Sequence, residues 1–268
     1  MQAPQRRFSP TRSIRRWVCQ NAGSNIGRRR INALRLRPHK MQRMRELIAA
    51  VNQRYPKDKF FDDLEQTLRD SRQARAMYRS YDRALQSLDS ASWEALQKKS
   101  VEHFRDYRLG QLKQGFFNQI NDAFAYEHLS RRGYSSIRVL RESGTTTPDI
   151  EYFNGQEIAG CEVKTLGISD DLIQRRESMS VFSGQIYEKL SVEYIKKLNK
   201  VISEAQEQIL SRYSGGLVYL VAHFDDFTMS HYSNYRLQLK GALGAHDVQN
   251  IYIKVGLLRN RRIEKSEA

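Results

Sequence analysis

The sequence is poor in cysteine and has no long hydrophobic run, and both absences narrow its class. Only Cys19 and Cys161 occur in 268 residues, too few for a zinc site or a disulfide framework. Cys161 is expected to be a small apolar residue of a strand, in a reducing compartment such as the cytoplasm. No apolar run approaches the length of a membrane span, and no secretory h-region is visible, so no membrane partner is expected.

Two common kinds of catalytic signature are also missing. The sequence shows no Gly-rich phosphate loop and no Ser/His/Asp arrangement. We therefore expect neither a nucleoside-triphosphatase engine nor a hydrolase that works through a covalent intermediate.

What the sequence has in excess is positive charge, and that charge is unevenly placed. Residues 1–50 hold thirteen Lys or Arg and one acid, Glu46, and so account for +12 of the net +15. Residues 1–40 lack sustained periodicity and are predicted to be a disordered basic arm. Three interpretations of this arm stay open: it neutralises nucleic-acid phosphates, it is an organelle transit peptide, or it lies upstream of a natural start at Met41 or Met44.

Residues 41–110 are predicted to form a helical region, because apolar residues recur at helical spacing and Asp89 to Ser92 offers capping residues. We expect the apolar stripes to be packing faces. The basic side chains of these helices are expected on a solvated surface, with a role in holding nucleic acid as the alternative: Arg72, Arg75, Arg79, Arg83, Lys98 and Lys99.

A further helix is predicted over Gly115–Leu129, with one apolar face that Ile120 and Phe124 help to form. Glu127 lies three residues after Phe124 and seven after Ile120, and is therefore predicted to point inward from that face. A buried carboxylate needs a partner. The alternatives are a surface glutamate at the end of the apolar stripe and a salt bridge to Arg131 or Arg132.

The segment from Thr147 to Leu166 is predicted to be a β-hairpin. Two strand-forming runs, 149–153 and 156–165, flank Asn154-Gly155, the strongest signal for a type I′ turn. Alternation along a strand puts Glu162 and Lys164 on one face, and antiparallel pairing returns the second strand towards Asp149. Two carboxylates and one ammonium are thus predicted to converge at one edge of a sheet.

Such a convergence is costly unless a cation sits among the acids, because neighbouring carboxylates repel and burial disfavours their charge. Mg²⁺ takes oxygen ligands from one or two carboxylates and keeps several waters. A metal ion there would polarise a phosphoryl oxygen and activate water, with a lysine beside it. The alternative is a solvated strand face with a cross-strand ion pair.

The remaining elements complete an α/β pattern. A strand is predicted over 136–140, and a polar, irregular stretch follows Leu166 up to Ser183. A long helix follows with an apolar stripe that Gln208 borders. The apolar run 217–224 is typical of a strand covered on both faces, and 250–258 is a further strand.

This order of elements, together with Glu127, Pro148-Asp149 and Glu162-Val163-Lys164, resembles the PD-(D/E)XK nuclease superfamily. The resemblance covers roughly residues 110–225. Its literal motif is short, and its specificity comes from the twelve residues that separate Asp149 from Glu162 across an Asn-Gly turn. It implies a restriction-endonuclease-like core of the order αβββαβ, like that of Holliday-junction resolvases, with a mixed central sheet flanked by helices.

By position, the resemblance implies that Asp149 and Glu162 bind Mg²⁺ or Mn²⁺, with the backbone carbonyl of Val163 as a third oxygen. It also implies that Lys164 lies near the attacking water.

Two further roles follow from the resemblance. Glu127 matches an acid that part of the superfamily carries on its first core helix. Gln208 corresponds to a polar residue that some members carry on the second core helix.

The sequence thus predicts a disordered basic arm (1–40), a helical region (41–110), a nuclease-like domain (111–258) and a charged tail (259–268). The expected function is metal-dependent hydrolysis of phosphodiester bonds, with DNA favoured over RNA as the partner; the resemblance also allows a homodimer. The alternatives are a non-catalytic nucleic-acid-binding module on the same fold and a protein-interaction role for the helical region.

Overall fold

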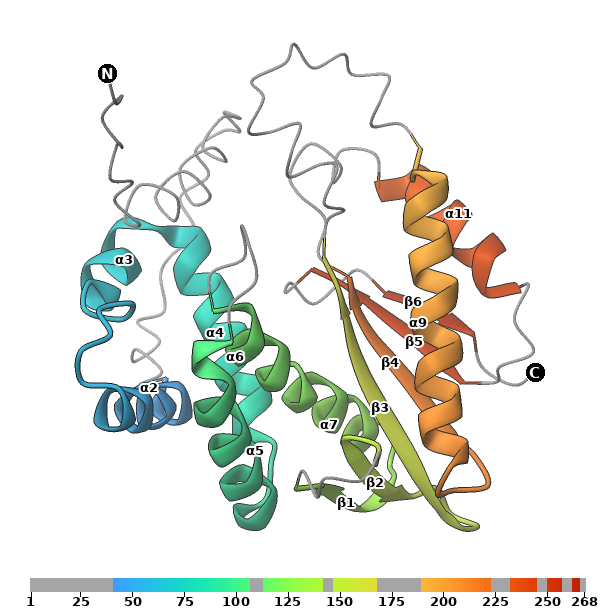
Figure 1. Cartoon of the computed structure of the whole chain (residues 1–268), viewed down its shortest axis with the longest axis horizontal. Coiled ribbons are helices and arrows are strands. Elements are labelled where there is room, and N and C mark those ends of the chain that lie inside the picture. Colours follow the sequence, from blue (N-terminus) through green and yellow to red (C-terminus); the bar gives the residue numbers. More distant parts are fainter. Residues whose placement is uncertain are drawn as a thin grey trace, which may run out of the picture.

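The computed structural model describes residues 41–106, 113–141, 147–167, 189–222, 232–244, 250–256 and 262–265. They form an α/β protein with one mixed six-stranded sheet (Figure 1). The helices are α2 (Gln42–Arg54), α3 (Leu64–Asp70), α4 (Arg72–Gln86), α5 (Ser90–Glu102), the 3₁₀ helix η1 (His103–Arg105), α6 (Gln114–Ile120), α7 (Asp122–Arg131), α9 (Val192–Leu210) and α11 (Tyr232–Gly244). The strands are β1 (Ser135–Val139), β2 (Ile150–Phe153), β3 (Ile158–Leu166), β4 (Gly216–Ala222), β5 (Ile251–Val255) and β6 (Arg262–Lys265).

The sheet keeps its strands in chain order, β1 to β6. β1, β2 and β3 pair antiparallel, because short connections join them. β3, β4 and β5 pair in parallel, and α9 and α11 lie in the two connections between them, as parallel strands require. β6 pairs antiparallel to β5 and forms the far edge. The predicted order of helix, three strands, helix and strand is present as α7, β1 to β3, α9 and β4.

β4 is buried on both faces, as its continuous apolar run predicts, and so it separates two hydrophobic cores. Leu217, Tyr219 and Val221 belong to the core that the N-terminal helices cover. The alternate residues of β4 belong to the core under α9 and α11. Figure 1 shows the three layers, with α9 and α11 on one side of the sheet and α2 to α7 on the other. The predicted end of this strand, 223–224, lies outside the described residues.

The predicted helical region is present as α2 to α5 and η1. Side-chain hydrogen bonds tie its helices together and to the sheet. The backbone N–H of Met44 donates to Asp82 Oδ1 (3.1 Å), which joins α2 to α4. The backbone N–H of Val139 donates to Ser92 Oγ (3.2 Å), which joins β1 to α5. The helical region therefore packs on the same sheet as the strands that carry Asp149 and Glu162.

The β2–β3 hairpin is present, but its turn is not the expected two-residue type I′ turn. Phe153 pairs with Ile158, so four residues form the loop. Gly155 has a positive φ of 104°, whereas Asn154 is not among the residues with positive φ. The Asn154 side chain instead accepts hydrogen bonds from the N–H groups of Gln156 (2.8 Å) and Glu157 (2.9 Å). Its local hydrogen bonding favours the longer loop.

Three other expectations need correction. The helix predicted over Gly115–Leu129 is divided at Asn121 into α6 and α7. The tail predicted over 259–268 contains β6, whose Ile263 is buried in the core under α9 and α11. Lys99, predicted to be exposed, is 7% exposed. The basic arm 1–40 and the polar stretch 168–183 lie outside the described residues.

Within the ranges described above, none of the helices combines the length and the apolar character that crossing a membrane requires.

Candidate active site

Asp149 stands at the start of β2, where the hairpin brings it opposite β3. The ladder pairs Ile150 with Cys161, so the next antiparallel position places Asp149 across from Glu162. The backbone N–H of Val163 donates to Asp149 Oδ2 (2.9 Å). The hairpin therefore brings together Asp149, Glu162 and Val163, the three residues predicted to bind a metal. Val163 joins the group through its N–H, and its predicted role as a carbonyl ligand stays a prediction.

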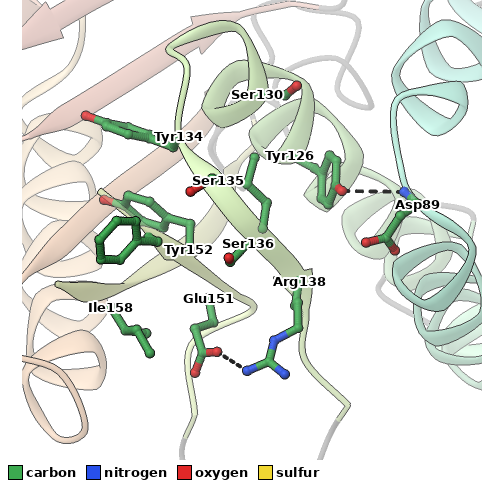
Figure 2. A pocket seen from close by; sticks show the side chains of 12 residues that line it. Asp89, Tyr126, Ser130, Tyr134, Ser135, Ser136, Arg138, Glu151, Tyr152 and Ile158 are labelled. Atoms are coloured by element: carbon green, nitrogen blue, oxygen red, sulfur yellow. Dashed lines mark hydrogen bonds and ion pairs between the residues drawn. The ribbon is translucent and has the colours of Figure 1, made fainter. Parts of the chain in front are cut away.

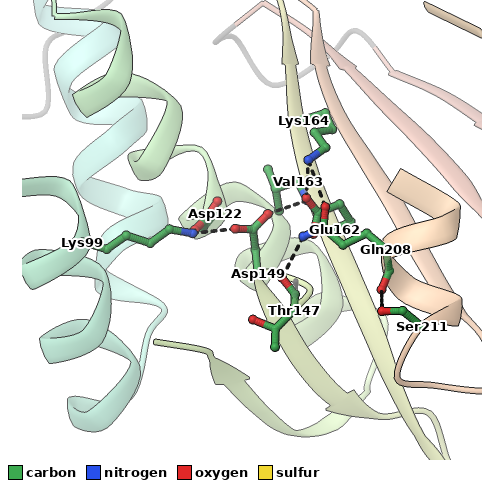
Figure 3. A network of polar contacts seen from close by, with 9 residues as sticks. All are labelled: Lys99, Asp122, Thr147, Asp149, Glu162, Val163, Lys164, Gln208 and Ser211. Atoms are coloured by element: carbon green, nitrogen blue, oxygen red, sulfur yellow. Dashed lines mark hydrogen bonds and ion pairs between the residues drawn. The ribbon is translucent and has the colours of Figure 1, made fainter. Parts of the chain in front are cut away.

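Glu162 and Lys164 share one face of β3, as strand alternation predicts, and α9 covers that face. Lys164 Nζ lies 2.5 Å from Glu162 Oε1 and 3.3 Å from Gln208 Oε1. The Gln208 amide in turn donates to the carbonyl of Thr147 (2.7 Å). Gln208 therefore links Lys164 on the sheet to the segment that carries Asp149, and Figure 3 shows these side chains converging.

Besides Lys164, the cluster contains Lys99, which contacts Asp149 from the helical region. Lys99 Nζ, on α5, lies 2.5 Å from Asp149 Oδ1 and 3.1 Å from Asp122 Oδ2 at the start of α7. Figure 3 shows Asp149 between Lys99 on the helical side and Val163 on the strand side. Asp122 is 2% exposed, so the ammonium offsets the charge of a buried carboxylate.

The charges of this cluster shift two pKa values. Burial and the nearby negative charge of Asp149 raise the pKa of Glu162 to about 8, although Lys164 acts in the opposite direction. Burial lowers the pKa of Lys99, but the charges and hydrogen bonds of Asp122 and Asp149 outweigh it, and the pKa ends above its ordinary value. The cluster thus favours the protonated, cationic form of Lys99 and disfavours the ionised form of Glu162.

The donor set suits a hard divalent cation in one respect. Glu162 is 2% exposed, and its Oε2 is a buried oxygen for which the described residues offer no hydrogen bond. A carboxylate oxygen in that condition is unusual and calls for an explanation such as a bound ion. Among the described residues, no three His, Cys, Asp or Glu side chains lie together as a metal cage. Mg²⁺ needs only one or two carboxylates, with waters and phosphate completing its shell.

Glu127 does not join this cluster, which corrects the sequence-based expectation. Its carboxylate lies 2.5 Å from Arg131 Nη2 and 3.6 Å from Arg83 Nε. The side chain is mostly buried, at 14% exposed, so the prediction that Glu127 points inward is confirmed. Its partners are arginines and not the groups around Asp149 and Glu162. The salt bridge to Arg131, one of the alternatives considered from sequence, is the arrangement that forms.

Sequence reasoning missed Asp122 and Lys99. Asp122 shares a helical stripe with Ala125, Tyr126 and Leu129, at i+3, i+4 and i+7, and all three are buried. That stripe is the signal that could have marked Asp122 as inward-facing. No comparable local signal marks Lys99, because its partner Asp149 lies 50 residues away.

A hollow of about 680 Å³ lies away from this cluster, at the other end of the hairpin, where Phe153 and Ile158 line it. Figure 2 shows Glu151 and Arg138 side by side at this hollow. Both carboxylate oxygens of Glu151 are used, one by Arg138 and one by the Tyr213 hydroxyl (2.7 Å). Burial would raise the pKa of Glu151, but these hydrogen bonds outweigh it and hold the pKa below its ordinary value. Unlike Glu162, this glutamate offers no open oxygen.

Comparison of the chain with protein-family models, with curated proteins and with solved structures found no match. The fold shows the class, an α/β protein with a mixed six-stranded sheet. The function is inferred from the acids, lysines and amide gathered around Asp149 and Glu162.

Proposed function

We propose that this protein is a metal-dependent nuclease with a restriction-endonuclease-like core, and that it hydrolyses phosphodiester bonds of DNA. The observation that carries the proposal is the buried Oε2 of Glu162, which has no hydrogen bond from the described part of the chain. Asp149 lies beside this glutamate, and Lys164 Nζ lies 2.5 Å from its other oxygen, Oε1. Two acids and a lysine placed together can hold a metal ion and offset charge on a phosphate, which suits phosphodiester hydrolysis. The order α7, β1 to β3, α9 and β4 supports the proposed core.

In this proposal, Asp149 and Glu162 hold Mg²⁺ or Mn²⁺, with the Val163 carbonyl as a further oxygen. Such an ion, when bound, polarises a phosphoryl oxygen and lowers the pKa of a bound water. The Lys164 ammonium offsets negative charge that develops on the phosphate. Gln208 fixes that ammonium, because its carbonyl oxygen accepts from Lys164 while its amide nitrogen donates to Thr147.

Charge supports nucleic acid as the substrate. The chain carries a net +15, and clustered Lys and Arg release counterions when they neutralise phosphates. The resemblance to the PD-(D/E)XK superfamily favours DNA over RNA, and it allows a homodimer.

One observation favours the alternative, a non-catalytic nucleic-acid-binding module. Lys99 already neutralises Asp149, so the acid cluster is partly balanced without a metal ion. This alternative predicts salt-dependent DNA binding that needs no divalent cation and survives Asp149→Ala.

The test is a cleavage assay of the full chain on supercoiled plasmid, linear duplex, single-stranded and branched DNA, with Mg²⁺ or Mn²⁺ and with EDTA. We expect cleavage that depends on the metal and is lost in Asp149→Asn and in Glu162→Gln. Glu157→Gln is the matched control, because Glu157 lies in the loop of the same hairpin and is exposed. If the folded protein leaves every form of DNA intact and binds DNA equally well in EDTA, the nuclease proposal is wrong. The non-catalytic binding module then takes its place.

A further inference from the structure

Lys99 is the residue through which the helical region contacts the acid cluster of Asp122, Asp149 and Glu162. It lies on α5 and its side chain is 8% exposed, and both of its acidic partners belong to other parts of the chain. A buried ammonium is stable only when it is paired and hydrogen-bonded. Lys99 meets that condition through Asp122 on α7 and Asp149 before β2.

The two oxygens of Asp149 are both engaged by the chain itself. Oδ1 accepts from Lys99, and Oδ2 accepts from the N–H of Val163. A divalent cation bound at Asp149 would share this carboxylate with the Lys99 ammonium. Two cations on one carboxylate repel strongly at low effective dielectric.

Asp122 is a second acidic partner for the Lys99 ammonium. Its Oδ2 lies 3.1 Å from the ammonium, so the lysine keeps a charged partner when it releases Asp149. A short movement of the Lys99 side chain would therefore let a divalent metal ion replace the Lys99 ammonium at Asp149. Lys99 and Asp122 would remain paired with each other.

We infer that Lys99 is an internal counter-cation that competes with a divalent metal ion for Asp149. Metal binding is thereby coupled to the contact between α5 of the helical region and the hairpin. This inference rests on the proposed metal-dependent function. Lys99 acts here as a positioning residue, since it holds Asp149 in place until a metal ion takes over the negative charge.

The test is the affinity of the full chain for Mn²⁺ alone, measured by calorimetry, with thermal unfolding as a second readout. Lys99→Met keeps the length of the side chain and removes its charge. We expect Mn²⁺ to bind about 10- to 100-fold more tightly, the size of effect found for groups beside metal ligands. We also expect a lower Tm without metal, and a larger rise of Tm on adding Mn²⁺ than in the unmodified protein.

Lys98→Met is the matched control, because Lys98 is the preceding residue of α5 and its side chain is 69% exposed. It removes the same charge from the same helix, and its Mn²⁺ affinity should equal that of the unmodified protein. A tightening of the same size in Lys98→Met would reduce the effect to general charge and would overturn the inference.

Lys99→Met leaves Asp122 buried without its cation and could fail to fold for that reason. The double variant Lys99→Met with Asp122→Asn avoids this, because it removes one positive and one negative charge together. Its net charge equals that of the unmodified protein, so tighter Mn²⁺ binding in the double variant is not an effect of net charge. An affinity equal to or weaker than that of the unmodified protein overturns the inference.

The outcomes separate this inference from the proposed function. If the unmodified protein binds Mn²⁺ and cuts DNA while both Lys99 variants bind Mn²⁺ no more tightly, competition is excluded and the nuclease stands. If the unmodified protein neither binds Mn²⁺ nor cuts, but the Lys99 variants bind it, competition is supported and the natural chain is not a metal-dependent nuclease. If neither form binds Mn²⁺, both are overturned.

Discussion

The ammonium of Lys164 lies 2.5 Å from Oε1 of Glu162, two residues earlier on β3. This contact occupies one oxygen of the acid and leaves the other, Oε2, buried without a hydrogen bond among the described residues. The lysine therefore neutralises the glutamate from one side and leaves its other side open to a ligand.

Lys164→Met should lower kcat by roughly 10²- to 10³-fold, the range for losing one electrostatic stabiliser of a transition state. The physical reason is that no other ammonium contacts Glu162 Oε1 within the described part of the chain. The measurement is single-turnover cleavage of DNA at saturating Mn²⁺. Lys196→Met, a change of an exposed lysine on α9, is the control and should cut normally. Equal rates in the two variants would exclude Lys164 from the reaction.

The stability of the metal-free protein should fall as pH rises from about 5 towards 8. Burial and Asp149 raise the pKa of Glu162 from 4.5 to about 8, so in this interval the native state keeps a proton that the unfolded chain has lost. Stability decreases with pH wherever the native state binds more protons than the unfolded state. Urea unfolding in EDTA at several pH values measures the slope. Glu162→Gln should flatten it, and Glu157→Gln should leave it unchanged. The same slope in all three proteins would show that Glu162 ionises normally.

The same raised pKa predicts how metal affinity depends on pH. A carboxylate must lose its proton before it binds a metal ion, so binding releases protons and tightens as pH rises. We expect Mn²⁺ affinity to increase up to about pH 8, with protons released in calorimetry across buffers of different ionisation heat. Lys164 lowers the pKa of Glu162, so Lys164→Met should move the rise in affinity to higher pH. A curve that is flat between pH 5 and 8 would contradict this account.

The parts that sequence predicted correctly are those whose causes are local. Strand alternation fixes Glu162 and Lys164 on one face, because successive side chains point to opposite sides of a pleated strand. The unbroken apolar run of β4 indicates burial on both faces for the same reason. Asp149 meets β3 because a short hairpin loop leaves few pairing registers.

The parts that sequence could not supply depend on packing between distant segments. Lysine is ordinarily a surface residue, and only the packing of α5 against α6 and β1 places the Lys99 ammonium between two acids. The resemblance assigned Glu127 to the site and its helical position predicted that it faces inward, but that direction leads to Arg83 and Arg131. Ile263 alone gives too weak a signal to predict β6, which forms because β5 offers it an unpaired edge.

Gln208→Ala should lower cleavage about 10- to 100-fold, as is usual when a residue that orients a metal-site group is lost. Gln208 accepts from Lys164 and donates to the Thr147 carbonyl, so its loss frees the lysine and the segment leading to Asp149. Mn²⁺ affinity should change less than kcat, since Gln208 contacts no predicted metal ligand side chain directly. Glu207→Ala, at the exposed preceding position of α9, should behave as the unmodified protein. A loss of affinity with kcat intact would contradict this assignment.

Glu127→Gln should separate the sequence-based role of this residue from the one that its contacts indicate. The carboxylate pairs with Arg131 and Arg83 and its side chain is only 14% exposed, so the change should cost about 1–3 kcal/mol of stability. DNA cleavage at saturating Mn²⁺ should be retained, because this pair lies apart from the contacts of Asp149 and Glu162. Asp122→Asn provides the comparison: it removes a partner of Lys99 and should alter Mn²⁺ affinity, whereas Glu127→Gln should not. Loss of cleavage in Glu127→Gln with stability and Mn²⁺ affinity intact would return Glu127 to the reaction and would mean that its ion pairs open when DNA binds.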